Sequence, residues 1–246
     1  MGTKERQDRE RQAVTASILD AARELFVAEG YQSVSIRKIA ERIEYSPAAI
    51  YSYFASKDDI FLALAAEGFH LLDAKVRAAM KTDDALENVR ACWWAFFEFS
   101  QEQPAYFQLM FVDRSVPRIT QQWEGFEFLQ GMLVNAVNAI QRAIDAGAFP
   151  ATMSPNTAMH MLWAALIGPA VVGLRHRLAS GEDYDALARD VLNATIAGLQ
   201  AGTPTTFVSC KCPAEAALLT DAPGTSRNEE GVAGAPVPAG ARRHES

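Results

Sequence analysis

The sequence of 246 residues is short of cysteine and of long apolar runs. Its three cysteines, Cys92, Cys210 and Cys212, are an odd number and provide no disulfide framework, which argues against a small cross-linked secreted domain. The N-terminus is charged and has no apolar h-region, so we expect no secretory signal. The longest apolar run, residues 162–174, is interrupted by glycine and proline and falls short of the roughly 20 residues that span a bilayer. We therefore expect a cytoplasmic protein that makes no membrane contact.

The chain also lacks an excess of positive charge. Its net charge is −7 and its pI is about 5.2, which argues against nonspecific coating of nucleic acid or of anionic lipid. The acidity is unevenly distributed, because residues 1–54 carry eight basic and eight acidic side chains, and the whole net charge lies in residues 55–246. An N-terminal DNA-binding site is therefore compatible with the composition, provided that it depends on a few placed contacts.

Composition divides the chain into four zones. Few segments alternate polar and apolar residues with a period of two, whereas spacings of three and four are frequent, so we predict an all-α fold. The last zone is rich in proline and glycine and has almost no large apolar side chains, which predicts a disordered tail. The zones are a charge-dense arm (1–13), a series of short helices (14–62), a set of longer helices (63–201) and the tail (203–246).

The short helices of the second zone have clear start and stop signals. We expect the first over residues 14–29, where an apolar stripe ends at Gly30. Ser35 is placed to cap a second helix, and Ser46 followed by proline begins a very short third one. Ser56, with an aspartate three residues later, opens a fourth. A helix, a short turn and a short helix packed on a preceding helix form the helix-turn-helix arrangement of DNA-binding proteins.

The residues of these helices closely resemble the tetracycline-repressor (TetR/AcrR) family. The resemblance rests on residues 35–42 (Ser-Ile-Arg-Lys-Ile-Ala-Glu-Arg), residues 46–54 (Ser-Pro-Ala-Ala-Ile-Tyr-Ser-Tyr-Phe) and residues 56–58 (Ser-Lys-Asp), and it covers residues 14–62. It implies an N-terminal three-helix DNA-binding domain followed by a C-terminal helical domain for ligand binding and dimerisation. It also implies a transcriptional regulator rather than an enzyme, more often a repressor, that binds a double-stranded DNA operator.

The resemblance assigns DNA contacts to individual residues. Ser35 would bind a phosphate at a helix N-terminus, and Arg37 would reach the DNA backbone or a base edge. Tyr51, Tyr53 and Lys57 would contact phosphates. The residues that would face the major groove are Ser46, Pro47, Ala48 and Ala49.

Two residues depart from the family pattern. Glu44 stands where the family usually has glycine, so a positive φ at this position would cost roughly 1 kcal/mol, and the carboxylate would lie near phosphates. Ala49 stands where family members often have threonine and cannot hydrogen-bond a base. Methyl contacts or DNA shape would then have to supply the readout, so the operator sequence does not follow from these residues.

Large aromatic residues and methionine are frequent in the C-terminal half. Such side chains form ordinary cores, but as a set, and given the family resemblance, we expect them to enclose a pocket for a small, largely apolar effector. His160, Arg175 and His176 are candidate polar anchors. The predicted pocket residues are Trp93, Phe96, Phe97, Phe107, Met110, Phe111, Trp123, Phe126, Met132, His160 and Trp163.

Small and apolar residues also recur at helical spacing along two C-terminal segments, which predicts a seam where helices approach closely. The family resemblance implies a homodimer in which these segments form a four-helix interface. Such a dimer would place two recognition helices about 34–36 Å apart and bind a palindromic operator, and effector binding would weaken that complex. The predicted interface residues are Ala165, Gly168, Val172, Leu187, Val191, Ala194 and Gly198.

Three alternative functions stay open. Glu67 and His70 have the E-x-x-H spacing of di-iron enzymes, although the second such pair that a di-iron site needs is missing. Cys210 and Cys212 have the spacing of a metal or redox sensor, but they lie in the predicted tail without a nearby histidine. The third alternative is a constitutive DNA-binding protein without an effector. We expect no cofactor and no bound metal.

Overall fold

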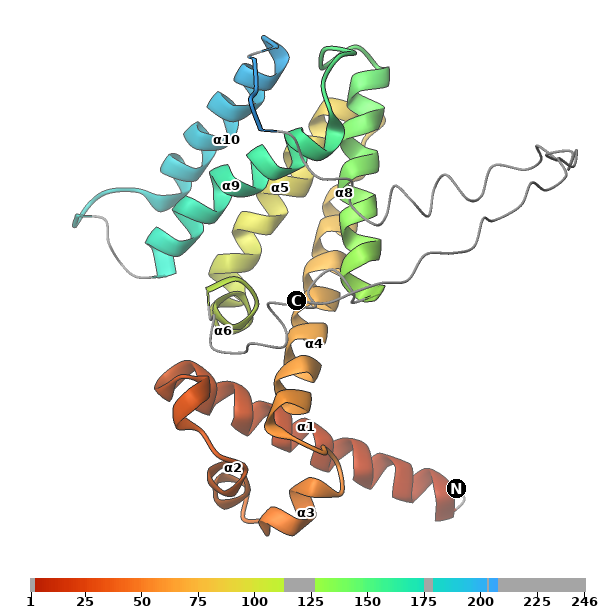
Figure 1. The fold of residues 1–246 in the computed structure, drawn as a ribbon, viewed down its shortest axis with the longest axis vertical. Helices are drawn as coiled ribbons and strands as arrows, with labels where there is room; N and C mark the ends of the chain where they lie inside the picture. Colours follow the sequence, from red (N-terminus) through yellow and green to blue (C-terminus); the bar gives the residue numbers. More distant parts are fainter. Residues whose placement is uncertain (1–2, 113–126, 175–178, 203, 208–246) are drawn as a thin grey trace, which may run out of the picture.

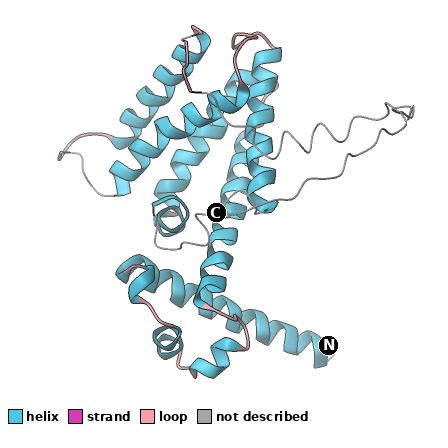
Figure 2. Cartoon of the chain, in the orientation of Figure 1, coloured by secondary structure: helices cyan, strands magenta, loops and turns pink. Residues whose placement is uncertain are grey.

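The computed structural model describes residues 3–112, 127–174, 179–202 and 204–207, and these described residues form helices and loops without any strand (Figures 1 and 2). The all-α prediction is confirmed for them. The N-terminal part contains α1 (Thr3–Glu29), the 3₁₀ helix η1 (Tyr31–Ser33), α2 (Ile36–Arg42) and α3 (Pro47–Tyr51). The long helix α4 (Lys57–Ala79) joins it to a C-terminal part with α5 (Ala85–Glu102), α6 (Pro104–Phe107), the π-helix η2 (Gln108–Val112), α8 (Glu127–Asp145), α9 (Pro155–Leu174) and α10 (Tyr184–Gln200).

Three serines begin helices as predicted. The side-chain oxygens of Ser35, Ser46 and Ser56 each accept a hydrogen bond from the backbone N–H three residues later, at 3.1–3.2 Å. Each bond satisfies one of the N–H groups that the first turn of a helix leaves without an intrahelical partner. The starts of α2, α3 and α4 are therefore determined locally, by residues that lie within one turn of each other.

The first helix is longer than predicted. It begins at Thr3 and not near Val14, so most of the charged arm is helical. The additional turns are supported by pairs four residues apart, such as the 2.9 Å ion pair between Arg6 and Glu10. These turns bury no apolar side chain, so apolar periodicity gave no signal for them.

Helix α5 lies at the centre of the C-terminal part and packs against α4, α8, α9 and α10 (Figure 1). The predicted zone of longer helices contains α5, α8, α9 and α10, and Pro169 lies inside α9. Among the described residues, α9 is the one helix whose length and composition would allow it to cross a membrane. A buried core helix passes the same test, and α9 packs against α5, α8 and α10 with Leu162, Leu166 and Ala170 fully buried.

Candidate nucleic-acid interface

Helices α2 and α3 are joined by a tight turn and packed on α1. Ile39 and Ala40 of α2 and Ile50 of α3 are fully buried, which fixes both helices on the N-terminal core. The backbone N–H of Tyr45 donates to the carbonyl of Ala40 at 2.9 Å and closes the turn. Glu44 has a φ of 59°, so this turn does adopt the left-handed conformation that favours glycine.

The free surface of α3 carries most of the residues predicted to face the groove. Ser46, Pro47 and Ala48 are exposed, Ala49 is half-buried, and the side chain of Tyr51 is 56% exposed. Tyr45, in the turn before α3, is also exposed and was not among the predicted contact residues. Its position directly before the helix-capping Ser46 was the signal available in the sequence.

Arg11 of α1 connects the predicted arm to the end of α3. Its Nη2 donates to the carbonyl oxygen of Ser52 at 3.2 Å, and its guanidinium lies 5.0 Å from the centre of the Tyr53 ring. Tyr53 is half-buried as a result of its packing, whereas Tyr51 projects outward. The two tyrosines therefore differ in environment, and the contact of Arg11 across 41 residues was not predictable from local spacing.

Lys57 is bound within the protein. Its ammonium donates to the carbonyl oxygens of Tyr31 and Val34, both at 2.8 Å, and lies 4.0 Å from the centre of the Tyr31 ring. Burial lowers the pKa of Lys57, against the opposing effect of Asp58. Two of the three ammonium hydrogens thus hold the η1 segment on the start of α4, and one is left for the predicted phosphate contact.

The cations of α2 all have acidic partners. Phosphate binding by any of them would have to compete with an intramolecular pair, and exposed pairs of this kind contribute little stability. The hydrogen bond to Glu41 raises the pKa of Arg37, so the predicted DNA contact of Arg37 carries a full charge. The pairs are Arg37–Glu41 and Arg42–Glu24, both at 2.8 Å, and Lys38–Glu29.

The C-terminal part contains an aromatic cluster, defined as Phe69, Trp93, Phe96, Phe107 and Phe111. Neighbouring rings lie with their centroids 4.9–6.1 Å apart, mostly edge to face. Four of the five rings were predicted pocket residues. Phe69 was missed because it lies on α4, the helix that joins the two parts. Met110 and Met132, also predicted for the pocket, are packed in the same core.

Other predicted pocket residues lie elsewhere. Trp163 is 41% exposed, because Leu162 and Leu166 of α9 face the interior and the next residue is turned by about 100° around the helix. Trp163 is therefore a surface residue of α9, and its place in a ligand pocket stays a prediction. The Nδ1 of His160 donates to the carbonyl oxygen of Asn156 at 2.7 Å, and its ring packs on Phe207. Phe97 packs against Trp94, away from the cluster. Trp123, Phe126, Arg175 and His176 lie outside the described residues.

A junction of four side chains joins the aromatic cluster to the N-terminal part. The Arg23 guanidinium of α1 donates to the hydroxyl of Tyr106 on α6 at 2.6 Å, and this hydroxyl is also hydrogen-bonded to Glu67 of α4. Burial and Glu67 raise the pKa of Tyr106 to about 12, so the phenol stays neutral and accepts from one partner while it donates to the other. A Cβ on Gly68 would lie 2.4 Å from the sulfur of Met110, so a larger residue at this position would have to displace the Met110 side chain.

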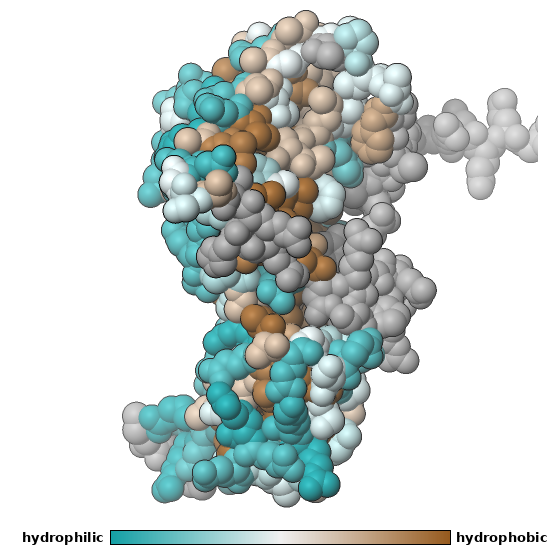
Figure 3. All heavy atoms as spheres, turned by 90° about the vertical axis from the view of Figure 1, so that its left-hand side faces the viewer, coloured by the Kyte–Doolittle hydropathy of each residue, from teal (hydrophilic) through white to brown (hydrophobic). Residues whose placement is uncertain are grey.

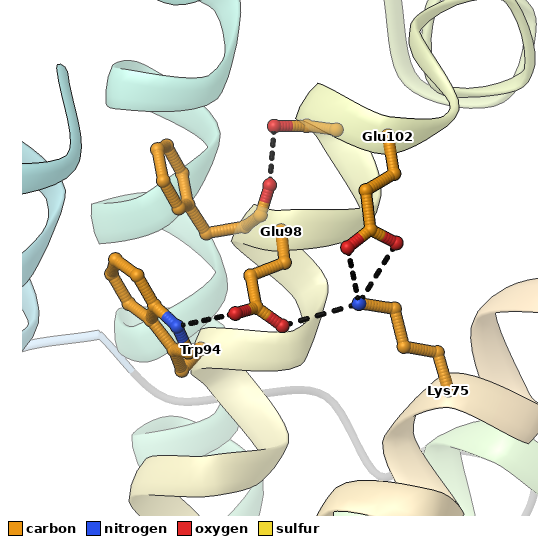
Figure 4. Close-up of polar contacts among 6 residues, drawn as sticks. Lys75, Trp94, Glu98 and Glu102 are labelled. Carbon is orange, nitrogen blue, oxygen red and sulfur yellow. Dashed lines mark hydrogen bonds and ion pairs between the residues drawn. The ribbon is translucent and has the colours of Figure 1, made fainter.

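A second network fastens α4 to α5 (Figure 4), and Trp94 of this network also contacts α10. The ammonium of Lys75 lies 3.1 Å from a carboxylate oxygen of Glu98 and 2.9 Å from Glu102. The indole N–H of Trp94 donates to Glu98 at 2.9 Å, and the Arg189 guanidinium of α10 lies 4.1 Å from the Trp94 ring centre. The far half of α4 is thus fixed to the C-terminal part, while its near half carries the junction.

The outer surface of α9 and α10 carries the predicted dimer residues, and we call it the α9/α10 face. Apolar side chains gather on this side of the C-terminal part, whereas the N-terminal part is largely hydrophilic (Figure 3). Trp163 of α9 and Leu187 of α10 are large exposed apolar side chains. Gly168, Leu187 and Ala194 are exposed, and Ala165, Val172, Val191 and Gly198 are half-buried.

The residues considered for metal or redox chemistry do not form a metal-binding cluster in the described part of the chain. The described part of the chain holds no group of three or more histidine, cysteine, aspartate or glutamate side chains that could bind a metal ion. Glu67 is engaged by Tyr106. Cys92 is buried, which raises the pKa of its thiol to about 12, and Cys210 and Cys212 lie outside the described residues.

Comparisons with known proteins agree with this architecture. Residues 18–64 match the family model of bacterial regulatory proteins of the tetR family, and residues 89–195 match the tetracyclin repressor-like C-terminal domain. The repressor AcnR of Corynebacterium diphtheriae is 28% identical over 173 residues, which are 70% of this chain and 84% of AcnR. The activator FasR of Mycolicibacterium smegmatis is 34% identical over 95 residues, 38% of this chain and 43% of FasR.

Solved structures share the fold. The fatty acid degradation regulator FadR of Bacillus halodurans superposes with a TM-score of 0.65 at 20% identity, covering 76% of this chain and 96% of FadR. FadR of Bacillus subtilis, solved in complex with stearoyl-CoA, gives the same TM-score and identity over 74% of this chain and 98% of its own. At this identity the likeness concerns the fold alone.

Proposed function

Because the chain belongs to the TetR family of DNA-binding transcriptional regulators, we propose that it is a repressor that binds a palindromic operator as a homodimer and is released by a small, largely apolar effector. The AcnR relatives are named repressors, and FasR, whose similarity covers less than half of its length, is named an activator. Repression, rather than activation, is therefore supported by the two AcnR relatives, which match over most of their length. Such a regulator acts in the cytoplasm, together with the DNA.

The DNA-binding part of the proposal is supported by the surface of α3. This helix is only five residues long, is anchored by the buried Ile50, and presents Ser46, Pro47 and Ala48 to solvent. A helix of this size enters a major groove about 12 Å wide. The side-chain oxygen of Ser35 accepts the cap hydrogen bond, so its hydroxyl hydrogen is available to a phosphate at the start of α2. Tyr51, 56% exposed, supplies a second hydroxyl.

The junction carries the effector part of the proposal. Tyr106 and Met110 flank the aromatic cluster and contact α1 through Arg23 and α4 through Gly68. An apolar molecule that inserts beside the cluster must displace α6 or η2, and the displacement reaches both α1 and α4. A π-helix such as η2 often marks a functional site. The stearoyl-CoA bound by the Bacillus subtilis FadR supports a long apolar chain as the first effector class to test.

The dimer part rests on the α9/α10 face. Its small residues permit close approach of helices, and Trp163 and Leu187 supply exposed apolar area. A two-fold dimer through this face leaves both copies of α3 at the far end of the molecule. Their separation would be about 34–36 Å, one turn of DNA, and a change in it lowers affinity by shifting the population away from the DNA-bound state.

A binding experiment tests the DNA part. An operator is selected from random duplexes with the full chain, and affinity is measured by fluorescence anisotropy. Tyr51→Phe is expected to lower affinity about 3–10-fold per site, as for one lost charge-assisted hydrogen bond. Tyr184→Phe removes a hydroxyl from α10 and is the matched control. If no duplex is selected, or if both variants bind like the parent chain, the assignment of α3 is wrong.

A titration tests the effector part. Stearoyl-CoA, free stearate and shorter acyl-CoAs are added to the DNA complex, and we expect at least one to lower affinity by 10-fold or more, the range of a coupling free energy above about 1.4 kcal/mol. Tyr106→Phe is expected to bind the same ligand but to release DNA less completely, because its link to Glu67 and Arg23 is lost. Unchanged DNA affinity with the whole panel would favour the constitutive alternative.

A further inference from the structure

The N-terminal turns of α1 extend beyond the packed N-terminal core. Figure 1 shows α1 continuing past α3 toward the N-terminus, on the side of the molecule where α2 and α3 lie. Residues 4–13 are exposed, and Val14 is the first residue of α1 that packs against the core. Local pairs and the contact of Arg11 with the end of α3 support these turns, and the rest of their surface is open to solvent.

The projecting turns have one face that is free of acidic residues. At about 100° per residue, Lys4, Gln7 and Arg11 lie within about 40° of Ile18 around the helix axis. Ile18 is fully buried against the N-terminal core, so this face points toward the side of α2 and α3. The three acidic residues of the turns, Glu5, Asp8 and Glu10, lie about 80° or more away from Ile18.

The face is continuous with the surface of α3. Arg11 holds the carbonyl of Ser52, directly after α3, and stacks on Tyr53. Gln7 and Lys4 follow one and two turns further toward the N-terminus along the same face of α1. Arg11 uses one of its five N–H groups for Ser52, which leaves others on the outer side of the guanidinium.

We propose that Lys4, Gln7 and Arg11, named here the α1 stripe, bind the sugar–phosphate backbone of DNA that flanks the half-site read by α3. This inference rests on the proposed function. DNA is the occupant that the charge favours, because the cations of α2 are already paired with acids whereas the α1 stripe has positive charge and no carboxylate. Contacts to the backbone position the protein without reading sequence, so the stripe extends the footprint outward on both sides of the operator.

Lys4→Ala tests the stripe, with Arg9→Ala as the matched control. Arg9 lies on the opposite side of α1, about 180° from Ile18, and its removal lowers the net charge equally. The probe is the duplex selected by the parent chain, with flanks of 10 or 2 base pairs outside the operator. Lys4→Ala is expected to reduce the slope of log K against log salt by about 1.8 per dimer, one phosphate contact per subunit, and affinity by about 3–10-fold. Arg9→Ala is expected to leave the slope within about 0.5 of the parent value.

The length of the flanks provides a second readout. Shortening them is expected to weaken the parent chain and Arg9→Ala but not Lys4→Ala, since only the stripe reaches that DNA. Arg11→Ala is expected to behave like Lys4→Ala and, in addition, to weaken binding to the short duplex because it releases Ser52. If the parent chain binds the duplex and Lys4→Ala and Arg9→Ala are indistinguishable, the stripe is overturned while the proposed function stands. If the parent chain selects no duplex, both fail.

Discussion

The helix-turn-helix domain and the C-terminal domain are stabilised by different means. In the first, short helices are defined by serine caps, and ion pairs such as Arg42–Glu24 link α2 to α1 across the surface. In the second, long helices interdigitate around aromatic rings, and Phe97, Phe99 and Phe107 are almost completely buried. Serine caps thus fix where the helices of the DNA-binding surface begin, the buried Ile50 anchors α3, and the packing of aromatic rings dominates the C-terminal domain.

Because of this difference, substitutions in the two domains should affect the stability of the fold differently. An exposed residue of α3 can change without disturbing the fold, because its neighbours are held by caps and by Ile50 below it. A residue of the aromatic cluster cannot change without disturbing the fold, because a change in side-chain volume displaces its neighbours in a close-packed interior. The proposed effector sensing in the C-terminal domain and the DNA recognition in the N-terminal one would therefore differ in their tolerance to substitution, and the two domains meet at Arg23, Tyr106 and Gly68.

The largest contrast is expected between Phe107→Ala and Tyr51→Ala. Phe107 has no exposed surface, so its truncation leaves a cavity and should lower the free energy of unfolding by about 3–5 kcal/mol. Tyr51 is 56% exposed, so its truncation should change the free energy by less than about 0.5 kcal/mol while it weakens DNA binding. Urea denaturation followed by circular dichroism measures both. Equal losses in the two variants would contradict the division between packed and locally determined regions.

Two glycines within helices should respond with opposite signs. A Cβ at Gly131 of α8 meets nothing within 4 Å, so Gly131→Ala should raise the free energy of unfolding by about 0.5–1 kcal/mol through helix propensity. A Cβ at Gly68 would lie 2.4 Å from the Met110 sulfur and 3.1 Å from Cδ1 of Tyr106. Gly68→Ala should therefore lose the propensity gain and destabilise the protein by about 1 kcal/mol or more.

Thermal denaturation measures the stability of Gly131→Ala and Gly68→Ala. The double variant Gly68→Ala/Met110→Ala serves as a control. Met110→Ala removes the sulfur that the new Cβ would meet, so the double variant should lose less than the sum of the two single losses. If Gly68→Ala is as stable as Gly131→Ala, the contact between α4 and η2 is not tight, and the junction loses the feature that makes it sensitive to displacement.

Sequence patterns predicted the helix-turn-helix domain well because its signals are short-range. Ser35, Ser46 and Ser56 cap helices where expected, and Glu44 adopts the positive φ for which the family uses glycine. The N-terminal extension of α1 was not predicted, because periodic burial reveals only helices with a buried face, and residues 4–13 are all exposed.

The candidate effector site was predicted less well. Aromatic content indicated the correct region, but Trp163 is on the surface and Phe69 of α4 completes the cluster. Which side of a helix faces a pocket depends on the helices that surround it, and composition does not give that arrangement. For the same reason the partners of Lys57 were not predicted. This residue, expected to contact phosphate, donates to the carbonyl oxygens of Tyr31 and Val34, which lie 23 or more positions away in the sequence.

The smallest expected effects concern Glu44, where local conformation and charge can be separated. Glu44→Gly should raise the free energy of unfolding by about 1 kcal/mol, because glycine adopts a φ of 59° without the steric cost of a Cβ. Glu44→Ala keeps the strain and should leave the stability nearly unchanged. Both variants remove a carboxylate from the turn before α3, so both should bind the selected DNA more tightly, by about 2–5-fold at low salt.

Thermal denaturation and anisotropy on the same two variants distinguish the causes. A gain in stability for both would mean that repulsion with neighbouring carboxylates, and not backbone strain, is relieved. A gain in affinity for Glu44→Gly alone would mean that the turn geometry limits how α3 enters the groove. If Glu44→Gly alone gains stability and both variants gain affinity, the charge of Glu44 lowers the affinity for DNA. The helix-turn-helix domain, whose residues 1–54 have zero net charge, then depends on its few placed contacts with DNA.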